Sequence, residues 1–280
     1  DIDMVICMYN VGDKDVFSFA SELKSRQREI PFVLLTHFSK EIYRRLALQD
    51  TSAVDYMFSW HGNADLIVAI IKLFEDLKNA DDDILGVGVQ AILLVEDSVR
   101  YYSTYLPELY KLVLKQSSEF LKETLNEQQR KFRKRSRPKI LLATNFDDAV
   151  EMYSKYKHNI LGVISDVGFN VHKDDSPEME KLDAGIDLVK LIKEDDPKIP
   201  ILLQSSQDSI SVVAEELGVG FLRKYSKTLM IQLADYIKEE FGFGDFVFRD
   251  SEHNEYGRAA NLKELEKMMR EVPDEVLLFN

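Results

Sequence analysis

The sequence predicts an α/β protein with a doubly wound, parallel, five-stranded sheet in two copies, of which the first is incomplete. The first observation is that short apolar runs alternate with helical patterns, as in strand–helix–strand units whose strands are parallel. The second is an internal repeat, because "IPFVLLTH" from Ile30 returns as "IPILLQSS" from Ile199. The third is that the second copy contains two strands that the first lacks. Such a repeat indicates two related domains.

In the first copy, three apolar runs have the length of buried strands. They are "MVICMYN" from Met4, "IPFVLLTH" from Ile30 and "VDYMFSW" from Val54, and helical patterns follow each of them. We expect residues 1–78 to be strands three to five of a domain whose first half precedes Asp1. The alternative is a naturally short three-stranded unit, which would leave an apolar sheet edge exposed.

The second copy is expected over residues 91–243. Its strands are predicted at "QAILLVEDS", "PKILLATN", "LGVISDVGFN", "IPILLQSS" and "VGFLRKYS". Residues 79–90, "NADDDILGVGVQ", are rich in Asp and Gly and are expected to be a linker. Residues 244–280 predict a strand and a helix with Asn261 as its N-cap and Glu264 three residues on, and we expect this extension to lead toward a further domain.

Composition excludes several classes of protein. The 280 residues are 45% hydrophobic and 30% charged, which fits a globular protein of about two domains. A net charge of −13 disfavours nucleic acid as a partner unless a local basic patch binds it. No apolar run approaches the ~20 residues that span a bilayer, so no membrane partner is expected. The single Cys7 excludes an internal disulfide and indicates a reducing compartment, hence a cytoplasmic location.

Polar side chains follow the predicted strands of the second copy, at the point where each strand ends. Glu96 and Asp97 end the first strand, Asp166 the third, Ser205 the fourth and Lys224 the fifth. Open α/β sheets bind ligands at the carboxyl ends of their strands. Three carboxylates, one hydroxyl and one ammonium group are therefore expected to converge on one edge.

This order of residues resembles the CheY-like receiver domains of two-component response regulators, which have a flavodoxin-like fold. The resemblance covers roughly residues 91–241 and extends to Phe221, at the position of the family's switch aromatic. It implies that Asp166 is a phosphoacceptor, that Lys224 and Ser205 contact the phosphoryl group, and that Ser205 and Phe221 form a conformational switch. It also implies a bacterial phosphoprotein that is not itself an enzyme, with a histidine kinase or phosphotransfer protein as its partner.

The expected cofactor is Mg²⁺. Three clustered carboxylates repel one another unless a hard cation neutralises them, and Mg²⁺ prefers oxygen ligands. The expected ligands are Glu96, Asp97, Asp166 and the backbone carbonyl of Gly168. Asp166 would attack the phosphoryl group of a phosphohistidine, while Mg²⁺ and Lys224 offset the charge on the transferred oxygens.

Two other functions stay open. One is a scaffold or dimerisation module that receives no phosphate. The other is the regulatory region of a phosphotransfer enzyme, because the tail and the repeated domains resemble, more weakly, bacterial multidomain proteins that carry a phosphoenolpyruvate-synthase-like module. A phosphatase of the haloacid dehalogenase type is disfavoured, since Gly168 stands where such enzymes need a second Asp.

In the first copy, the same template predicts a degenerate site. Met8 stands at the phosphoacceptor position, Thr36 at the hydroxyl position, Tyr56 at the aromatic position and Ser59, followed by Trp60, at the lysine position. Without an Asp nucleophile or a Lys, this copy resembles a pseudo-receiver that packs against or binds protein.

Three features depart from the family. A helix expected over residues 99–132 is too long, and it either packs on its own domain or serves as an arm for a homodimer or for docking a neighbouring domain. It ends in "RKFRKRSRPK", from Arg130 to Lys139, which is interpreted as a solvated helix end with nucleic-acid binding as the alternative. The loop "NVHKDDSPEMEKLDAG" after Asp166 is long and either gates the site or is a mobile insertion. Tyr225 replaces the usual Pro after the lysine.

Overall fold

The computed structural model describes residues 2–9, 15–37, 49–122, 137–173, 175, 179–242, 246–250, 255–259, 262–273 and 277–279. By its internal contacts the chain divides into two units. The smaller unit contains residues 1–74 and 98–108, and the larger unit contains residues 75–97 and 109–280. Each unit has its own parallel sheet, so the predicted α/β class is confirmed.

The larger unit contains a five-stranded sheet in the order β5-β4-β6-β7-β8, all of it parallel. Its strands are β4 (Ala91–Val95), β5 (Lys139–Ala143), β6 (Ile160–Asp166), β7 (Ile201–Ser205) and β8 (Gly220–Arg223). The sheet grows in both directions from β4, which is the flavodoxin-like order. The direction of winding reverses between β4 and β6, and ligands bind at such a point in open sheets.

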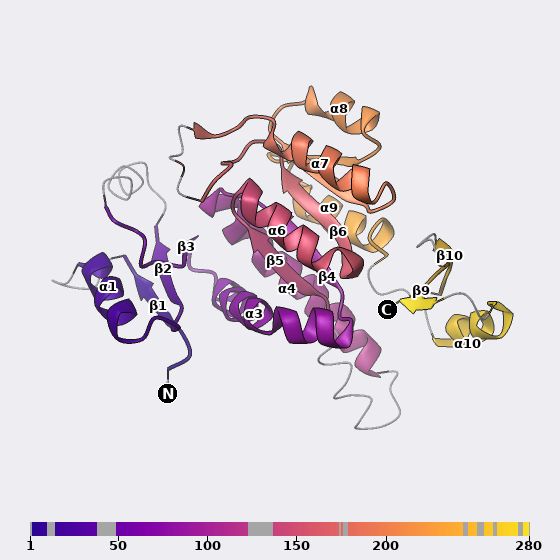
Figure 1. Ribbon diagram of the computed structural model, residues 1–280, viewed down its shortest axis with the longest axis horizontal. Helices are drawn as coiled ribbons and strands as arrows, with labels where there is room; N and C mark the ends of the chain where they lie inside the picture. The colour runs from indigo at the N-terminus through magenta and orange to yellow at the C-terminus, as the bar shows by residue number, and fades with distance from the viewer. Residues whose placement is uncertain are drawn as a thin grey trace. The chain divides into compact units, whose positions relative to one another are not determined.

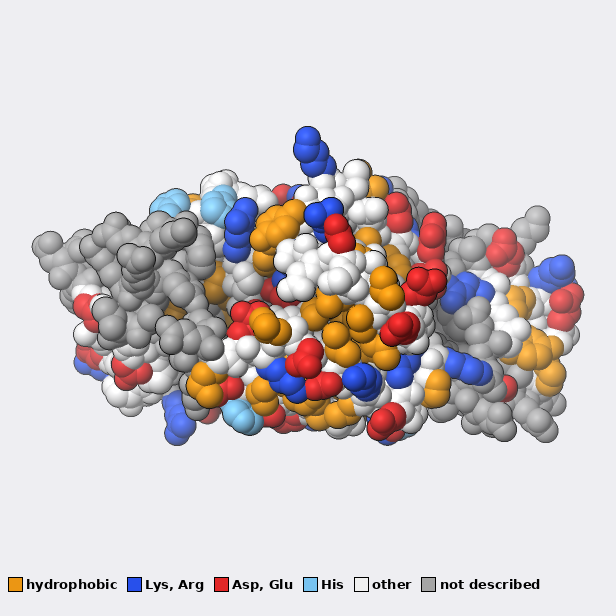
Figure 2. Space-filling view, turned by 90° about the horizontal axis from the view of Figure 1, so that it is seen from above, with side chains coloured by type: hydrophobic (Ala, Val, Ile, Leu, Met, Phe, Trp, Pro, Cys, Tyr) orange, Lys and Arg blue, Asp and Glu red, His pale blue; other side chains and the backbone are white. Residues whose placement is uncertain are grey.

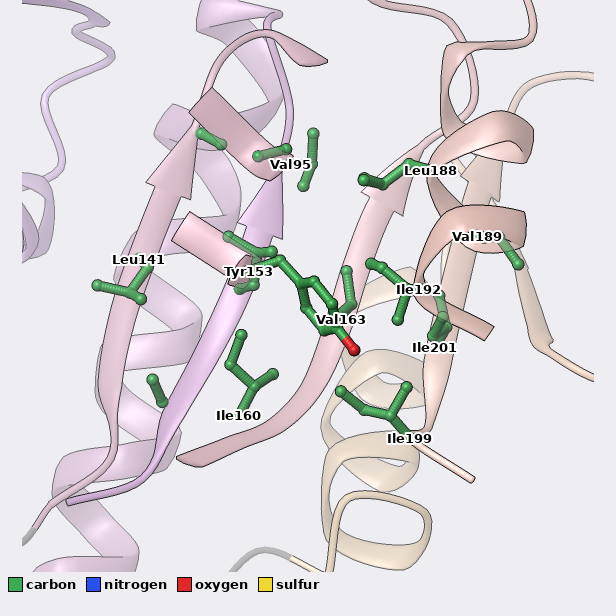
Figure 3. Close-up of a cluster of buried hydrophobic side chains, with 14 of the residues drawn as sticks. Val95, Leu141, Tyr153, Ile160, Val163, Leu188, Val189, Ile192, Ile199 and Ile201 are labelled. Atoms are coloured by element: carbon green, nitrogen blue, oxygen red, sulfur yellow. The ribbon is translucent and has the colours of Figure 1, made fainter. Parts of the chain in front are cut away.

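Helices lie on both faces of this sheet. The helices after β4 are α4 (Val99–Lys122), α6 (Phe146–Tyr156), α7 (Ala184–Asp195), α8 (Ile210–Glu216) and α9 (Leu229–Glu239). In Figure 1, α6 and α7 cover one face and α9 lies behind the other. The main core fills the space between the sheet and α6 and α7. Figure 3 shows Leu141, Val163 and Ile201 of three strands meeting Tyr153 and Ile192 of the two helices. Each buried side chain of this size stabilises the fold by roughly 1.5–3 kcal/mol.

Two glycines allow aromatic rings to pack closely on the sheet. A Cβ on Gly162 would lie 2.4 Å from the ring of Phe241, and one on Gly220 would lie 2.4 Å from the ring of Tyr236. The Tyr236 hydroxyl also donates a hydrogen bond of 2.9 Å to the carbonyl of Ile201. These contacts hold α9 and the residues after it against β6, β7 and β8.

The expected linker at residues 79–90 is helical for most of its length. Helix α3 (Asp65–Ala80) runs on into a π-helix at Asp81–Gly86. Ile84 is fully buried there, and its carbonyl accepts a hydrogen bond of 3.1 Å from Asn159. Asp81 accepts one of 2.6 Å from the Tyr156 hydroxyl. The acidic run therefore has partners in the larger unit. The boundaries of the two proposed copies stay a prediction.

Two basic residues of the expected solvated helix end are buried instead. Arg137 makes a bidentate ion pair with Asp76, at 2.6 and 2.9 Å, and Asp76 is 0% exposed. Tyr110 donates a further hydrogen bond of 2.9 Å to Asp76, and Lys139 lies 2.5 Å from Asp83. Paired guanidinium and ammonium groups of this kind are not available to nucleic acid. Residues 123–136, which hold the other basic residues, lie outside the described residues.

The surface carries both signs of charge. On the face drawn in Figure 2, acidic and basic side chains are interspersed among hydrophobic ones. No basic field is visible on that face in the described part of the chain, and whether nucleic acid is a partner stays a prediction.

The smaller unit contains three parallel strands in the order β1-β2-β3. They are β1 (Val5–Met8), β2 (Phe32–Thr36) and β3 (Tyr56–Ser59). Helix α1 (Val16–Arg26) connects the first two, and Asp15 caps it by accepting a hydrogen bond of 2.8 Å from the Ser18 N–H. Its buried Phe17 and Ala20 pack on β2. The helix expected after β2 covers residues 39–49, of which all but the last lie outside the described residues.

The first turns of α4 belong to the smaller unit and pack at the edge of its sheet. The Tyr102 hydroxyl donates to the carbonyl of Met57 in β3, and the Ser59 N–H donates to the Ser103 hydroxyl at 2.9 Å. The Tyr102 ring meets Phe58 edge-on, with centroids 5.3 Å apart. β3 is an edge strand of this sheet. These side chains therefore form hydrogen bonds with main-chain groups that an uncovered edge would leave exposed. These first turns of the helix therefore pack on the sheet of their own unit, and the use of the helix as an arm for docking or for a homodimer stays a prediction.

The tail forms a third, antiparallel sheet in the order β10-β9-β11. Its elements are β9 (Phe246–Arg249), β10 (Glu255–Ala259), α10 (Leu262–Glu271) and β11 (Leu277–Phe279). A strand and a helix were expected there, and two further short strands accompany them. None of the helices among the described residues is both long and apolar enough to cross a membrane.

Candidate functional site

The carboxyl ends of the parallel strands bring the predicted site residues to one edge of the larger sheet. Asp166 and Ser205 are the last residues of β6 and β7, and Glu96 and Lys224 directly follow β4 and β8. The ladder continues for one residue past β8, since the Lys224 N–H donates to the Ser205 carbonyl at 3.0 Å. The apolar runs of β4, β6 and β7 are buried, and each polar residue comes at or just after the end of its strand.

Lys224 connects the last strand of the sheet to two acidic groups. Its ammonium group lies 2.8 Å from Glu96 Oε2 and also pairs with Asp166 Oδ2. The other carboxylate oxygen of Asp166 accepts a hydrogen bond of 2.7 Å from the Val167 N–H. The side chains of Lys224 and Glu96 are 6% and 1% exposed. The cost of removing these three charged groups from water offsets much of their mutual attraction. A gain in stability is therefore a weak explanation for this buried lysine with two carboxylate partners.

The acidic groups of the site resist ionising together. Burial raises the pKa of Glu96 to about 8, and the Asp166 charge adds to this while Lys224 opposes it. Burial, followed by the charges of Asp166 and Glu180, raises the pKa of Asp97 to about 6. Burial also raises the pKa of Asp166, against the effect of Lys224. The site therefore favours a bound positive charge.

The donor set suits a hard divalent cation. Glu96, Asp97 and Asp166 each offer one carboxylate oxygen, and these three atoms lie within 4.8 Å of one another. An all-oxygen set of this kind fits Mg²⁺. Gly168 follows Asp166 by two residues on the same loop, and the ligand role of its carbonyl stays a prediction.

The two expected switch residues lie on neighbouring strands. Ser205 is buried, and its hydroxyl accepts a hydrogen bond of 3.2 Å from the Gln207 N–H. Phe221 pairs with Leu203 across β7 and β8 and packs against the main core. It also lines a surface pocket of about 500 Å³, together with Tyr225.

The long loop after Asp166 is tied back to the strand end. Phe169 and Lys181 exchange two main-chain hydrogen bonds, of 3.2 and 3.1 Å. Gly185, at the start of α7, donates to the Val167 carbonyl at 2.9 Å. Glu180 of this loop lies against Gly168, where a Cβ would be 2.5 Å from its Oε1. Glu180 carries no signal in the sequence that marks it as part of the site, because it lies twelve positions after Gly168 and only the fold of the loop brings the two together.

The strand register changes the assignment of the lysine position in the smaller unit. In the larger sheet, Ser205 pairs with Arg223, the residue before Lys224. In the smaller sheet, Thr36 pairs with Ser59, so under the two-copy interpretation the register matches Lys224 with Trp60, one residue after Ser59. The Trp60 N–H donates to the Thr36 carbonyl at 2.9 Å, as the Lys224 N–H does to Ser205.

The aromatic position shifts in the same way. Phe221 pairs with Leu203, two residues before the end of β7. Under the two-copy interpretation, the matching pair in the smaller sheet is Met57 with Leu34, so the register matches Phe221 with Met57 and not with Tyr56. A shift of one residue moves a side chain to the other face of a strand, which is why the sequence match alone did not reveal it.

The register of the smaller sheet matches Met8 with Asp166. Met8 pairs with Leu35, the residue before Thr36, just as Asp166 pairs with Gln204, the residue before Ser205. The smaller unit thus has a thioether at the matching strand position, and its interpretation as a degenerate phosphoacceptor site stays a prediction.

Comparison with known proteins leaves the family open. No protein-family model matches the chain, and no curated protein matches it. Among solved structures, a response regulator receiver domain protein from Clostridium thermocellum is similar at 18% identity and a TM-score of 0.36, covering 55% of this chain and 95% of that one. A similarity of this size establishes neither fold nor function. The flavodoxin-like order of the larger sheet rests on its own strand pairing.

Proposed function

We propose that the larger unit is a receiver domain of two-component signalling, in which Asp166 accepts a phosphoryl group from a phosphohistidine. The observation that carries this proposal is the contact of one buried ammonium group, that of Lys224, with both Glu96 and Asp166. The third acid, Asp97, completes a cluster whose raised pKa values favour a bound cation. The acidic groups, the proposed nucleophile Asp166 and the Lys224 ammonium group thus lie close together at the edge where open α/β sheets bind ligands.

The transfer is a displacement at phosphorus. An oxygen of Asp166 attacks the phosphorus atom, the P–O bond forms, and the P–N bond of the phosphohistidine breaks. The imidazole nitrogen leaves and takes a proton from solvent. Lys224 already pairs with Asp166 Oδ2 and offsets the charge on the transferred oxygens.

Glu96, Asp97, Asp166 and the Gly168 carbonyl would hold Mg²⁺. When bound, the cation supplies positive charge that stabilises the phosphoryl oxygens. The protein residues bind and orient the donor, so the domain acts as the substrate of a histidine kinase or phosphotransfer protein rather than as an enzyme.

The output of the site would be a shift between two conformations. The Ser205 hydroxyl would donate to a phosphoryl oxygen, and this would move the loop after β7, where the hydroxyl now accepts from Gln207. Phe221 on the neighbouring strand would then repack. A ligand that binds one conformation better shifts the population toward it.

We further infer that the smaller unit is a degenerate receiver. Its strands pair in the register of β6, β7 and β8, which supports the two-copy interpretation. With Met8 and Trp60 at the nucleophile and lysine positions, it would not accept a phosphoryl group. Its role would be to contact protein, as the docking of the first turns of α4 suggests.

The proposal is tested by phosphorylation with a small donor. Incubation of the full chain with acetyl phosphate and Mg²⁺ should add the mass of one phosphoryl group, and Asp166→Asn should abolish the gain. Asp235→Asn, an exposed change on α9, is the matched control and should keep it. If the unsubstituted chain neither gains this mass nor binds beryllofluoride, the phosphoacceptor proposal is wrong and the scaffold alternative is favoured.

A further inference from the structure

The loop between β6 and α7 places one acidic side chain against the candidate site. Glu180 Oε1 would lie 2.5 Å from a Cβ on Gly168, a distance that real Cβ contacts do not allow. The carboxylate therefore occupies the space that a side chain two residues after Asp166 would fill. Because residue 168 is a glycine, it has no side chain that would exclude the Glu180 carboxylate.

Main-chain bonds hold this part of the loop in place. Lys181, the next residue, exchanges two hydrogen bonds with Phe169, whose ring is fully buried. The Lys181 ammonium group also pairs with Asp187 of α7. The backbone beside Glu180 is thus fastened both to the strand end and to the following helix, although the Glu180 side chain itself is exposed.

The Glu180 carboxylate lies beside Gly168, whose carbonyl is one of the expected ligands of the cation. A cation bound at this edge would therefore be attracted by the negative charge of Glu180.

We propose that Glu180 is a positioning residue of this site: a loop carboxylate that takes the side-chain place of Gly168 and strengthens divalent-cation binding by its charge. The inference rests on the proposed function and deepens it, because it assigns to the long loop a part in building the cation site. Glu180 acts on the cation through space and does not touch the reacting phosphorus atom.

The test is Mg²⁺ titration of the full chain by calorimetry. Glu180→Gln keeps the shape and removes the charge, and it should weaken Mg²⁺ binding roughly threefold to tenfold. Gly168→Ala should weaken it similarly, because the new methyl group displaces the carboxylate. The double variant should bind no more weakly than the weaker single variant, since both changes remove one interaction. Glu215→Gln, an exposed change on α8, should bind as the unsubstituted chain does.

The outcomes separate this inference from the proposed function. If the unsubstituted chain binds Mg²⁺ and Glu180→Gln binds it equally well, the role of Glu180 is wrong while the receiver proposal stands. If the effects of Glu180→Gln and Gly168→Ala simply add, the steric part of the inference is wrong. If the unsubstituted chain does not bind Mg²⁺, the cation site itself fails. Circular dichroism of each variant confirms that the comparison is between folded proteins.

Discussion

The ammonium group of Lys224 lies 2.8 Å from Glu96 Oε2, and this contact joins the residue after β8 to the residue after β4, across two intervening strands. The same ammonium group pairs with Asp166 of β6. One side chain from the end of β8 therefore offsets the charge of acids at the ends of β4 and β6, and its removal should affect stability as well as chemistry.

Lys224→Met should destabilise the larger unit, because it leaves Glu96 and Asp166 buried without their cation. Breaking a buried ion pair from one side costs about 3–5 kcal/mol. The loss is measured as a lower urea midpoint in the absence of divalent ions. Lys238→Met, an exposed change on α9, is the control. An unchanged midpoint for Lys224→Met would show that the ammonium group does not compensate these acids.

The stability of the larger unit should depend on pH and on Mg²⁺ together. The folded pKa of Asp97 is raised to about 6 and that of Glu96 to about 8, above ordinary values of about 3.9 and 4.3. The folded state thus binds these protons more tightly, so their stabilising contribution is present at low pH and is lost as pH rises from about 4 to about 8.

Mg²⁺ binds the deprotonated carboxylates and should restore the stability that is lost as the pH rises. The increase in Tm on adding Mg²⁺ should therefore be larger near pH 8 than near pH 6, as measured by thermal scans. Glu96→Gln combined with Asp97→Asn should flatten both dependences. A Mg²⁺ effect that is the same at both pH values would contradict this prediction.

Arg137→Met should also be strongly destabilising. Arg137 binds both oxygens of the fully buried Asp76, and its loss removes the guanidinium charge that offsets this carboxylate. We expect the free energy of unfolding, measured by urea denaturation, to fall by about 3–5 kcal/mol. Lys190→Met, on the exposed face of α7, should change stability by less than about 0.5 kcal/mol. Equal midpoints for the two variants would mean that the buried pair contributes little.

Ser103→Ala should weaken the edge of the smaller sheet. The Ser103 hydroxyl accepts from the Ser59 N–H, and removing it leaves a buried donor without its partner, which costs about 1–3 kcal/mol. Trp60, the single tryptophan of the chain, directly follows β3 and reports on this edge by fluorescence. Thr104→Ala, one residue along on the exposed side, should shift the fluorescence transition less. A shift no larger than that of this control would exclude an edge-capping role.

The sequence predicts the parallel α/β class, and the structure brings together three of its candidate ligands, Glu96, Asp97 and Asp166. Each lies at or just after the end of an apolar strand, so local pattern and the geometry of parallel sheets suffice to place them. What could not be predicted depends on pairing across the chain. Trp60 and Met57 take their positions from strand register, which a slip of one residue reverses.

Other features depend on partners that are distant in the sequence. The Asp-rich run at residues 81–83 has the composition of a linker, but Tyr156 and Lys139 bind it into the fold. Glu180 reaches Gly168 only because the intervening loop folds back. Charge and turn composition describe a segment by itself, and they do not specify what it meets.

The way the chain shares its helices between the two units has a consequence for dissection. The chain passes from the smaller unit to the larger at Glu75, returns at Ser98 and leaves again at Leu109. A protein that ended at residue 78 would lack Tyr102 and Ser103, and the edge of β3 would be open to pair with other chains. A protein that began at residue 91 would lack Asp76 and would bury Arg137 beside no carboxylate. No single cut yields two intact pieces. Each unit has its own sheet, but each is built from two separate segments of the chain, so neither can be produced alone as one continuous fragment.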